Sequence, residues 1–185
     1  MTLILNNYTN KLNSLQALSN KINGEMRALY MDNIFLTWRW WLCAAMTILP
    51  WVLWIIFRKK GSTSRLLFSG FVVIILSMLL DDIGVELNFW DYHVDIDAIN
   101  PSFILWDMSV LPVVTMTFLQ YKTNINPLIK ALVFAGLASF VVEPFFAWMN
   151  FYDPEKWKHL YSFPVFIIIY LLAHFCSLRK SFGNL

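Results

Sequence analysis

The stretch from Leu66 to Leu80 reads LLFSGFVVIILSMLL, and Asp81 and Asp82 follow it directly. Every residue in this stretch is apolar or small, which is typical of a helix that crosses a membrane. A membrane span needs about 20 residues, so we expect the helix to continue through both aspartates and to end near Val85. The sequence therefore places two acids at the end of a predicted span.

Four further segments have the same character, and the composition of the whole chain agrees with them. The 185 residues are 58% hydrophobic and only 14% charged, whereas a soluble domain contains about 25% charged residues. Because the apolar residues fall in blocks, we predict an all-α membrane protein in which residues 33–185 form a helix bundle of five transmembrane helices. The predicted spans are 33–57, 66–85, 102–121, 128–150 and 160–178.

The distribution of basic residues predicts the orientation of this bundle. Lysine and arginine gather in the loops on one side and are absent from residues 82–101 on the other side. An excess of these residues marks the cytoplasmic side, so we predict an outer N-terminus and a cytoplasmic C-terminus. Lys156 and Lys158 on the outer side are a mild exception. The predicted cytoplasmic residues are Arg58, Lys59, Lys60, Arg65, Lys122, Lys130, Arg179 and Lys180.

Several other classes of protein are disfavoured. The net charge of +2 is small and no basic patch is interleaved with aromatic residues, so nucleic-acid binding is not expected. Cys43 and Cys176 lie far apart in apolar segments, which argues against a disulfide or a zinc site. Residues 91–97 alternate oxygen ligands but lack the glycine and the final glutamate of a calcium loop. We therefore expect no metal and no cofactor.

Residues 1–32 are predicted to form a different element outside the membrane. Apolar residues recur there at spacings of three and four with polar residues between them, which indicates an amphipathic helix. This helix could lie in the outer membrane interface, cap the bundle or pair with another chain. Because the heptad pattern is short and is broken at Ser19, we favour the interface. The apolar residues are Leu12, Leu15, Ile22, Met26 and Leu29.

Ionisable residues lie within or at the ends of the predicted spans, at a similar depth. A charge in hydrocarbon is costly, so each such residue needs a partner, a proton or water and is a functional candidate. At 1.5 Å per residue, each lies within roughly 10 Å of the outer boundary, and together they could form one site. The candidates are Arg39, Asp81, Asp82, Asp107 and Glu143, with Trp106 and Trp148 as aromatic neighbours.

Each of these charges also has a simpler interpretation. Arg39 could extend to the outer headgroups between tryptophans, or it could form a structural ion pair with Asp107 or Glu143. Asp81 and Asp82 could end their span and reach water. One arginine cannot balance every acid, so we expect at least one buried carboxyl group to keep its proton.

Two prolines lie close to the acids of the third and fourth spans. Within a helix, Pro112 and Pro144 would each remove one hydrogen bond and free the carbonyl group four residues earlier. Those carbonyls belong to Met108 and Phe140. Free carbonyls at membrane depth are tolerated where protein surrounds them or where they line a wet cavity. The prolines therefore indicate either a polar pocket or packing kinks without a ligand.

Three strings of the sequence resemble a known family. These strings are WDMSVLP at 106–112, EPFFAW at 143–148 and WKHLYSFP at 157–164. They resemble an uncharacterised family of small five-span membrane proteins from spore-forming Gram-positive bacteria, over about residues 34–180. The resemblance implies five spans and a bacterial plasma membrane, and it implies no reaction or ligand. In residue type alone, the chain is also similar to multi-span terpene and carotenoid cyclases, in which acids lie among aromatic residues.

The sequence thus predicts an integral membrane protein with an acidic pocket in the outer leaflet. We expect this pocket to bind a small cation, a lipid headgroup or a membrane partner, which includes a second copy of the chain. Asp107 and Glu143 would accept the ligand, Arg39 would balance their charge, and Asp81 and Asp82 would form the rim. The alternatives are a membrane-embedded enzyme that acts on a lipid or isoprenoid by acid catalysis, and a structural scaffold.

Overall fold

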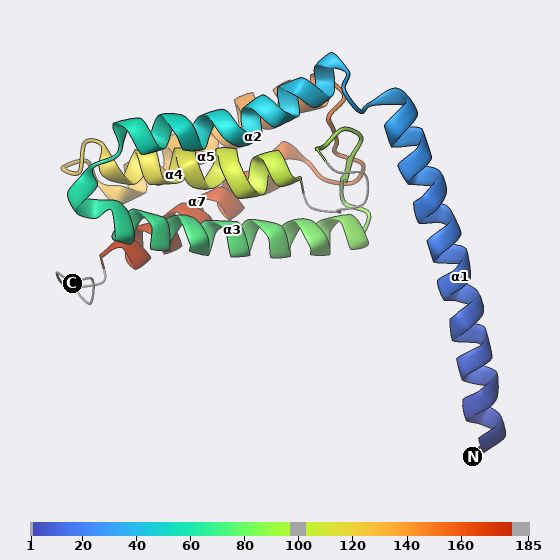
Figure 1. The fold of residues 1–185 in the computed structure, drawn as a ribbon. Helices are drawn as coiled ribbons and strands as arrows, with labels where there is room; N and C mark the ends of the chain where they lie inside the picture. Colours follow the sequence, from blue (N-terminus) through green and yellow to red (C-terminus); the bar gives the residue numbers. More distant parts are fainter. Residues whose placement is uncertain (1, 97–102, 179–185) are drawn as a thin grey trace.

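The computed structural model describes residues 2–96 and 103–178, and it describes their side chains from residue 5 onward. The protein is all-α apart from one two-residue antiparallel ladder, and most of its helices run side by side in a bundle (Figure 1). The predicted start of the third span at Ser102, Asp97 in the loop before it, and the predicted cytoplasmic residues Arg179 and Lys180 lie outside the described residues.

The described part of the chain contains α-helices, short π and 3-10 segments and two short strands. The π segments η2 and η3 continue directly into α4 and α6, so each pair makes one bent helical rod. The elements are α1 Thr2–Asn33, α2 Trp38–Phe57, η1 Lys60–Ser62, α3 Thr63–Glu86, β1 Asp91–Tyr92, η2 Trp106–Val110, α4 Leu111–Gln120, α5 Pro127–Leu137, η3 Ala138–Val142, α6 Glu143–Trp148, β2 Tyr152–Asp153 and α7 His159–Ser177.

Four helical stretches in the described residues are long and apolar enough to cross a membrane. They coincide with the first, second, fourth and fifth predicted spans. The rod made by η2 and α4 is helical from residue 104 to residue 120 and is shorter than the other four. The four stretches are Trp38–Phe57, Lys60–Glu86, Pro127–Trp148 and His159–Ser177.

Polar and apolar side chains are distributed as in a membrane protein. Large apolar residues such as Phe71, Ile75 and Phe175 are exposed on the outer faces of the helices, while Thr115 and Ser69 are fully buried inside the bundle. A soluble protein rarely exposes apolar surface this continuously. The apolar faces therefore point toward lipid, and the polar groups have collected in the interior.

The half of the bundle away from the β1–β2 ladder is held together by a core formed by α3, α4, α5 and α7. Met116 on the central helix α4 packs among Val73, Phe134 and Tyr170, all of them buried. The end of α4 is closed by Lys130, whose ammonium group donates to the carbonyls of Phe118 and Tyr121 at 2.7 and 2.6 Å. This core fixes the helices whose outer ends surround the cavity described below.

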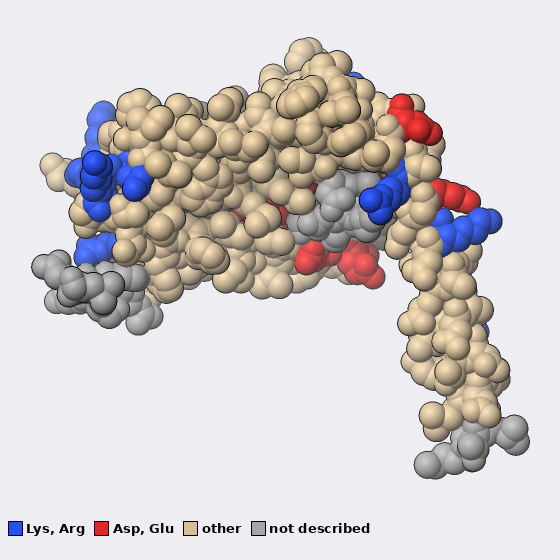
Figure 2. All heavy atoms as spheres, in the orientation of Figure 1, with Lys and Arg blue, Asp and Glu red and all other residues tan. Residues whose placement is uncertain are grey.

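Charge is distributed unevenly along the bundle. Lysine and arginine gather at the end where α3 begins, and acidic residues gather toward the opposite end, together with further basic residues (Figure 2). The β1–β2 ladder and the loops around it lie at this second end (Figure 1). The arrangement agrees with the loop pattern from which the orientation was predicted.

The N-terminal helix α1 begins at Thr2 and continues without a break to Asn33, over nearly the whole of the predicted segment 1–32. It stands apart from the bundle and runs crosswise to the other helices (Figure 1). One attachment lies near its end, where the hydroxyl of Tyr30 is 3.0 and 2.7 Å from the carbonyl oxygens of Asp95 and Ile96. The corner between α1 and α2 includes Leu36, with a φ of 60°.

Candidate functional site

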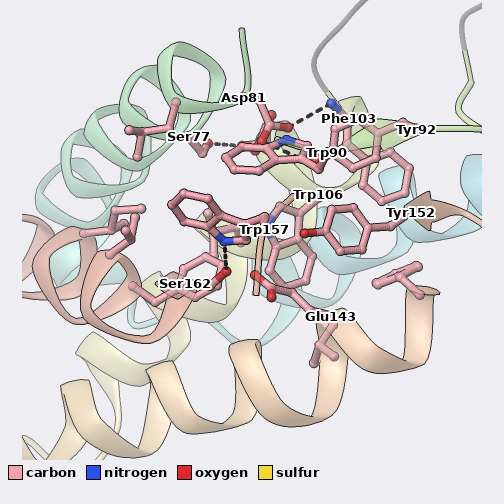
Figure 3. A pocket seen from close by; sticks show the side chains of 18 residues that line it. Ser77, Asp81, Trp90, Tyr92, Phe103, Trp106, Glu143, Tyr152, Trp157 and Ser162 are labelled. Carbon is pink, nitrogen blue, oxygen red and sulfur yellow. Dashed lines mark hydrogen bonds between the residues drawn. The ribbon is translucent and has the colours of Figure 1, made fainter. Parts of the chain in front are cut away.

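A cavity of about 80 Å³ lies among the helix ends near the β1–β2 ladder, which partly covers it (Figure 3). Its wall combines acids, serines, tyrosines and tryptophans. The polar lining residues are Ser77, Asp81, Tyr92, Asp107, Glu143, Tyr152 and Ser162, and the tryptophans are Trp90, Trp106 and Trp157.

Four of the seven residues predicted for the site line this cavity. Asp81 comes from α3, Trp106 and Asp107 from η2, and Glu143 from the start of α6. These residues are distant in sequence, so the bundle brings together acids that the sequence could place only at a common depth.

The other three predicted residues do not line the cavity. The guanidinium group of Arg39 lies 5.5 Å from the ring centre of Trp38, and the expected ion pair with Asp107 or Glu143 is not formed. Asp82 is exposed, because neighbouring residues on a helix point about 100° apart and Asp81 takes the inward direction. Trp148 is 79% exposed at the end of α6.

Asp81 connects three parts of the structure. The hydroxyl of Tyr92 donates to its Oδ1 at 3.0 Å, and the backbone N–H of Phe103 donates to its Oδ2 at 3.2 Å. The rings of Tyr92 and Phe103 stack with their centres 4.7 Å apart. Asp81 thus holds the β1 strand and the residue that precedes the η2–α4 rod against α3.

Asp107 is the least compensated acid in the described part of the chain. Its side chain is 1% exposed, and neither carboxyl oxygen makes a hydrogen bond of regular geometry with the described residues. Its polar neighbours are the carboxyl group of Asp81 and the hydroxyl of Ser77. No described lysine or arginine forms an ion pair with either acid. Two adjacent buried carboxyls without a basic partner require a shared proton or a bound cation.

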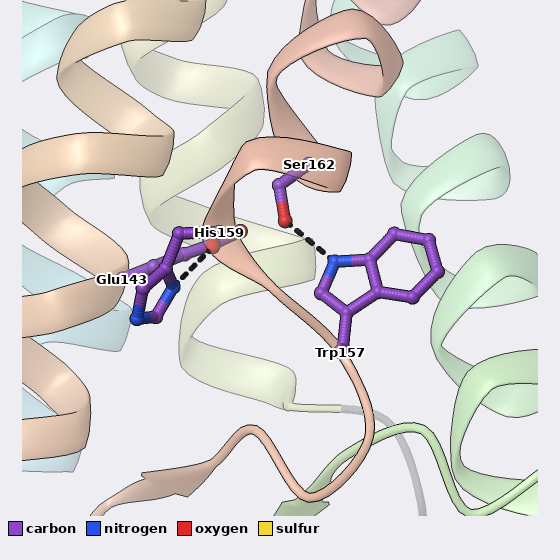
Figure 4. A network of polar contacts seen from close by, with 4 residues as sticks. All are labelled: Glu143, Trp157, His159 and Ser162. Atoms are coloured by element: carbon purple, nitrogen blue, oxygen red, sulfur yellow. Dashed lines mark hydrogen bonds and ion pairs between the residues drawn. The ribbon is translucent and has the colours of Figure 1, made fainter.

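Glu143 has a partner that the sequence analysis did not assign. Its Oε2 lies 2.9 Å from Nδ1 of His159, the first residue of α7 (Figure 4). Both side chains are partly exposed, so this pair lies nearer to the outside than Asp107 does. A glutamate within an apolar span needs a partner. This requirement could have directed attention to His159, which directly precedes the next predicted span.

The two tyrosines at the cavity are neutral hydrogen-bond donors. Burial raises the pKa of the Tyr92 hydroxyl well above its ordinary value, and the nearby charge of Asp81 raises it further. Burial also raises the pKa of Tyr152, with Glu143 as the next cause. Both residues belong to the β1–β2 ladder, outside the helices. They therefore keep their protons at neutral pH and can face an acidic site without repelling it.

Two π segments shape the helices that contain Asp107 and Glu143. Asp107 lies inside η2, and Glu143 directly follows η3. Short π segments within α-helices are frequent at functional sites, because the extra residue turns side chains out of the regular helical register. Here both segments precede a proline at the start of the next helical turn, Pro112 in α4 and Pro144 in α6.

The carbonyl group that Pro112 was expected to free is satisfied by protein. The indole N–H of Trp51 on α2 donates to the carbonyl oxygen of Met108 at 2.9 Å. The hydroxyl of Ser77 lies 3.5 Å from the carbonyl oxygen of Asp107, in the same π segment. For Met108 the packing interpretation of the proline is therefore the correct one.

Tryptophans close the cavity toward the loops. The rings of Trp90 and Trp157 meet edge to face with their centres 5.0 Å apart, and the indole N–H of Trp157 donates to the hydroxyl of Ser162 at 2.8 Å (Figure 4). Trp90 packs directly on Gly84 of α3, where a Cβ would fall inside its ring. The absence of a side chain at Gly84 thus permits this wall of the cavity.

The size and chemistry of the cavity limit what it can hold. A cavity needs about 10–15 Å³ of internal volume for each water molecule, so about 80 Å³ has room for a small ion together with several waters. No group of three or more His, Cys, Asp or Glu among the described residues is arranged to hold a metal ion.

Comparison with known proteins assigns no function to the site. No protein-family model matches the chain, and no curated protein and no solved structure matches it.

Proposed function

We propose that this chain is a five-span membrane protein whose outer cavity binds a small cation between Asp81 and Asp107. The observation on which this depends is the buried carboxyl group of Asp107, which lies beside that of Asp81 and forms no ion pair with a described lysine or arginine. A monovalent cation, together with one proton kept by the pair, would balance both acids and reduce the cost of burying them. The surrounding aromatic rings would contribute further, because their faces attract cations.

Five spans, with the η2–α4 rod as the third, are part of this proposal. The rod is helical over residues 104–120, and Leu111, Met116 and Thr115 on α4 are buried within the bundle. Although it is shorter than the others, its central position means that little of it must face lipid. The proposed orientation has the cavity end outside and the basic end in the cytoplasm, in the plasma membrane of a bacterium.

Glu143 and His159 have a secondary role in this proposal. Glu143 lines the cavity and bonds to His159 beside it, and both side chains are partly exposed. The bond to His159 would hold the Glu143 carboxyl group in place at the side of the cavity.

The enzyme alternative has one observation in its favour, the combination of acids and aromatic rings around a single cavity. Such a combination suits an acid-catalysed reaction through a carbocation. The cation proposal is favoured over it because a cation accounts for the buried pair of Asp81 and Asp107, which a neutral isoprenoid or lipid would leave without a compensating charge.

The test compares the thermal stability of the purified protein with and without small cations. Sodium, potassium and ammonium salts are each added at constant ionic strength, with choline as a much bulkier comparison cation. A ligand at 100 times its Kd stabilises a protein by about 2.7 kcal/mol, which corresponds to several degrees in Tm for a chain of this size. We expect at least one small cation to raise the Tm and choline to leave it unchanged.

The variant Asp107→Asn decides whether the cavity is responsible. It should lose the cation-dependent rise in Tm, and in the absence of cations it should be at least as stable as the parent because the unpaired acid is gone. Asp82→Asn, which changes the adjacent exposed acid, is the matched control and should keep the full rise. A cation effect that survives in Asp107→Asn, or no cation effect in the parent, would contradict the proposal.

A further inference from the structure

The full length of α1 shows a regular heptad pattern. Its apolar side chains alternate at spacings of three and four residues along the whole helix, with Ser19 as the single polar exception. A strict 3.5-residue repeat is the pattern of a two-helix coiled coil, whereas a helix on a lipid surface has a wider apolar face. The positions fall into two sets, Leu5, Leu12, Ser19 and Met26 in the first and Tyr8, Leu15, Ile22 and Leu29 in the second.

These two sets of positions form one stripe along α1, called the seam. The seam is not covered by any other described part of a single copy of the chain. Leu5 is 58% exposed near one end and Leu29 is 64% exposed near the other, and the apolar residues between them are exposed as well. The opposite face of α1 is rich in asparagine, and the helix contains three basic residues, Lys11, Lys21 and Arg27. A helix that binds lipid headgroups is usually rich in basic residues on its polar face. The seam therefore fits another helix better than a membrane surface.

The direction of α1 determines how a second copy could approach. α1 runs crosswise to the bundle, close to its loop end, and Tyr30 attaches it there (Figure 1). With the bundle upright in a membrane, α1 then lies along the membrane plane. A two-fold axis perpendicular to the membrane reverses the direction of such a helix and keeps both bundles in the same orientation. Parallel pairing of crosswise helices would turn one bundle upside down.

We propose that α1 of one copy pairs with α1 of a second copy in an antiparallel two-helix coiled coil. The antiparallel register places the two sets of seam positions opposite each other. Leu5 then meets Leu29 of the second copy, Leu12 meets Ile22, and Met26 meets Tyr8. Ser19 meets Leu15 near the centre, where one small polar residue in the seam favours a defined register.

The charges beside the seam agree with the same register. Lys11 and Glu25 both flank the seam at equivalent heptad positions, which face each other across an antiparallel pair. Lys11 of each copy therefore meets Glu25 of the other, and the two-fold axis repeats this attraction twice. The other flanking positions are polar or apolar without charge near the centre, as at Gln16 and Leu18. No like charges are opposed there.

Cysteine cross-linking in a membrane tests the proposal. In a Cys176→Ser background, with Cys43 fully buried, Leu18→Cys places two thiols next to the two-fold axis, and mild oxidation should give a disulfide-linked dimer. Leu5→Cys places them about 36 Å apart, at 1.5 Å per residue, and should stay monomeric. A link at Leu5→Cys would show parallel pairing and overturn the proposal. No link at either position would show that α1 lies alone on the membrane, which also overturns it.

A charge exchange separates pairing from lipid binding. Glu25→Lys places a lysine opposite Lys11 of the second copy. The Kd of the dimer should therefore rise about tenfold. Lys11→Glu combined with Glu25→Lys restores both attractions and should restore the dimer. On anionic vesicles, a lipid-bound α1 would respond to Glu25→Lys with tighter binding, and that result would contradict the proposal. These measurements leave the cavity unchanged, so their outcome is independent of the proposed cation site.

Discussion

At the scale of single residues, depth in the membrane and direction around a helix are separate quantities. Asp81 and Asp82 are adjacent in the chain, yet Asp81 is 7% exposed and lines the cavity while Asp82 is exposed. Arg39 lies at a depth similar to that of the acids but packs on Trp38. Residue counting along a span gives depth, and the side that a residue faces depends on packing with other helices.

Gly84 gives a sharp test of the cavity wall. A Cβ at this position would overlap with the ring of Trp90. Because the ring is rigid, the whole side chain would have to shift. We therefore expect Gly84→Ala to destabilise the protein by about 1–3 kcal/mol and to reduce the cation effect, because Trp90 must move. Thermal unfolding measures the first effect.

Gly24 is the matched control for this substitution. A Cβ at Gly24 of α1 meets nothing within 4 Å, so Gly24→Ala should be neutral or should stabilise α1 by up to about 1 kcal/mol. Equal stability of Gly84→Ala and the parent would show that Trp90 does not pack on α3 as described.

At the scale of whole elements, the apolar runs predicted four helices that are long and apolar enough to cross a membrane, because length and hydropathy are read directly from the sequence. The loops between them were not predictable in the same way. Tyr92 and Tyr152 reach the cavity through a ladder of two residues per strand, which is too short to leave a periodic signal. His159 likewise meets Glu143 only because η3, which directly precedes Glu143, packs against α7.

The start of α1 was also obscured in the sequence. Asn6, Asn7 and Asn10 fall within its first turns, and asparagine has a low helix propensity. The apolar repeat therefore seemed to begin near residue 10. With the helix starting at Thr2, Leu5 and Tyr8 join the seam, and the pattern is long enough for pairing.

The bond between α2 and the η2 segment is a second testable feature of the elements. Trp51 donates to the carbonyl of Met108, which the turn before Pro112 leaves without its helical partner. Trp51→Phe keeps an aromatic ring but removes this donor, so we expect a loss of about 1 kcal/mol of stability. Thermal unfolding of the purified protein measures this loss.

Trp38 provides the control for Trp51, since it is 62% exposed near the start of the same helix. Trp38→Phe should change the unfolding temperature by much less. If Trp51→Phe unfolds at the same temperature as the parent, the Met108 carbonyl must have another partner.

At the scale of the whole molecule, the proposed orientation makes opposite predictions for the two ends of the bundle. Lys60 lies in η1 at the basic end, and Lys156 lies in the loop before α7 at the cavity end. In intact cells, a membrane-impermeant maleimide should label Lys156→Cys and should leave Lys60→Cys unlabelled until the membrane is opened. The reverse pattern would place the cavity on the cytoplasmic side.

The sequence could supply the acids of the site and their common level, but it could not supply their partners. Asp107, Asp81, Glu143 and Trp106 were recognisable because charge and tryptophan are conspicuous in apolar segments. The serines and tyrosines that complete the cavity are ordinary residues in such a sequence. Only the packing of α3, η2, α6 and α7 at one end of the bundle distinguishes them.

Asp81 has one further consequence, because its two oxygens already hold the hydroxyl of Tyr92 and the amide of Phe103. A cation that draws this carboxylate toward Asp107 competes with both bonds. Filling the cavity would therefore loosen the β1 strand and the start of the η2–α4 rod at this end of the bundle. Cation binding in the cavity would in this way change the loops around the β1 strand, which a partner protein could contact without reaching the cavity.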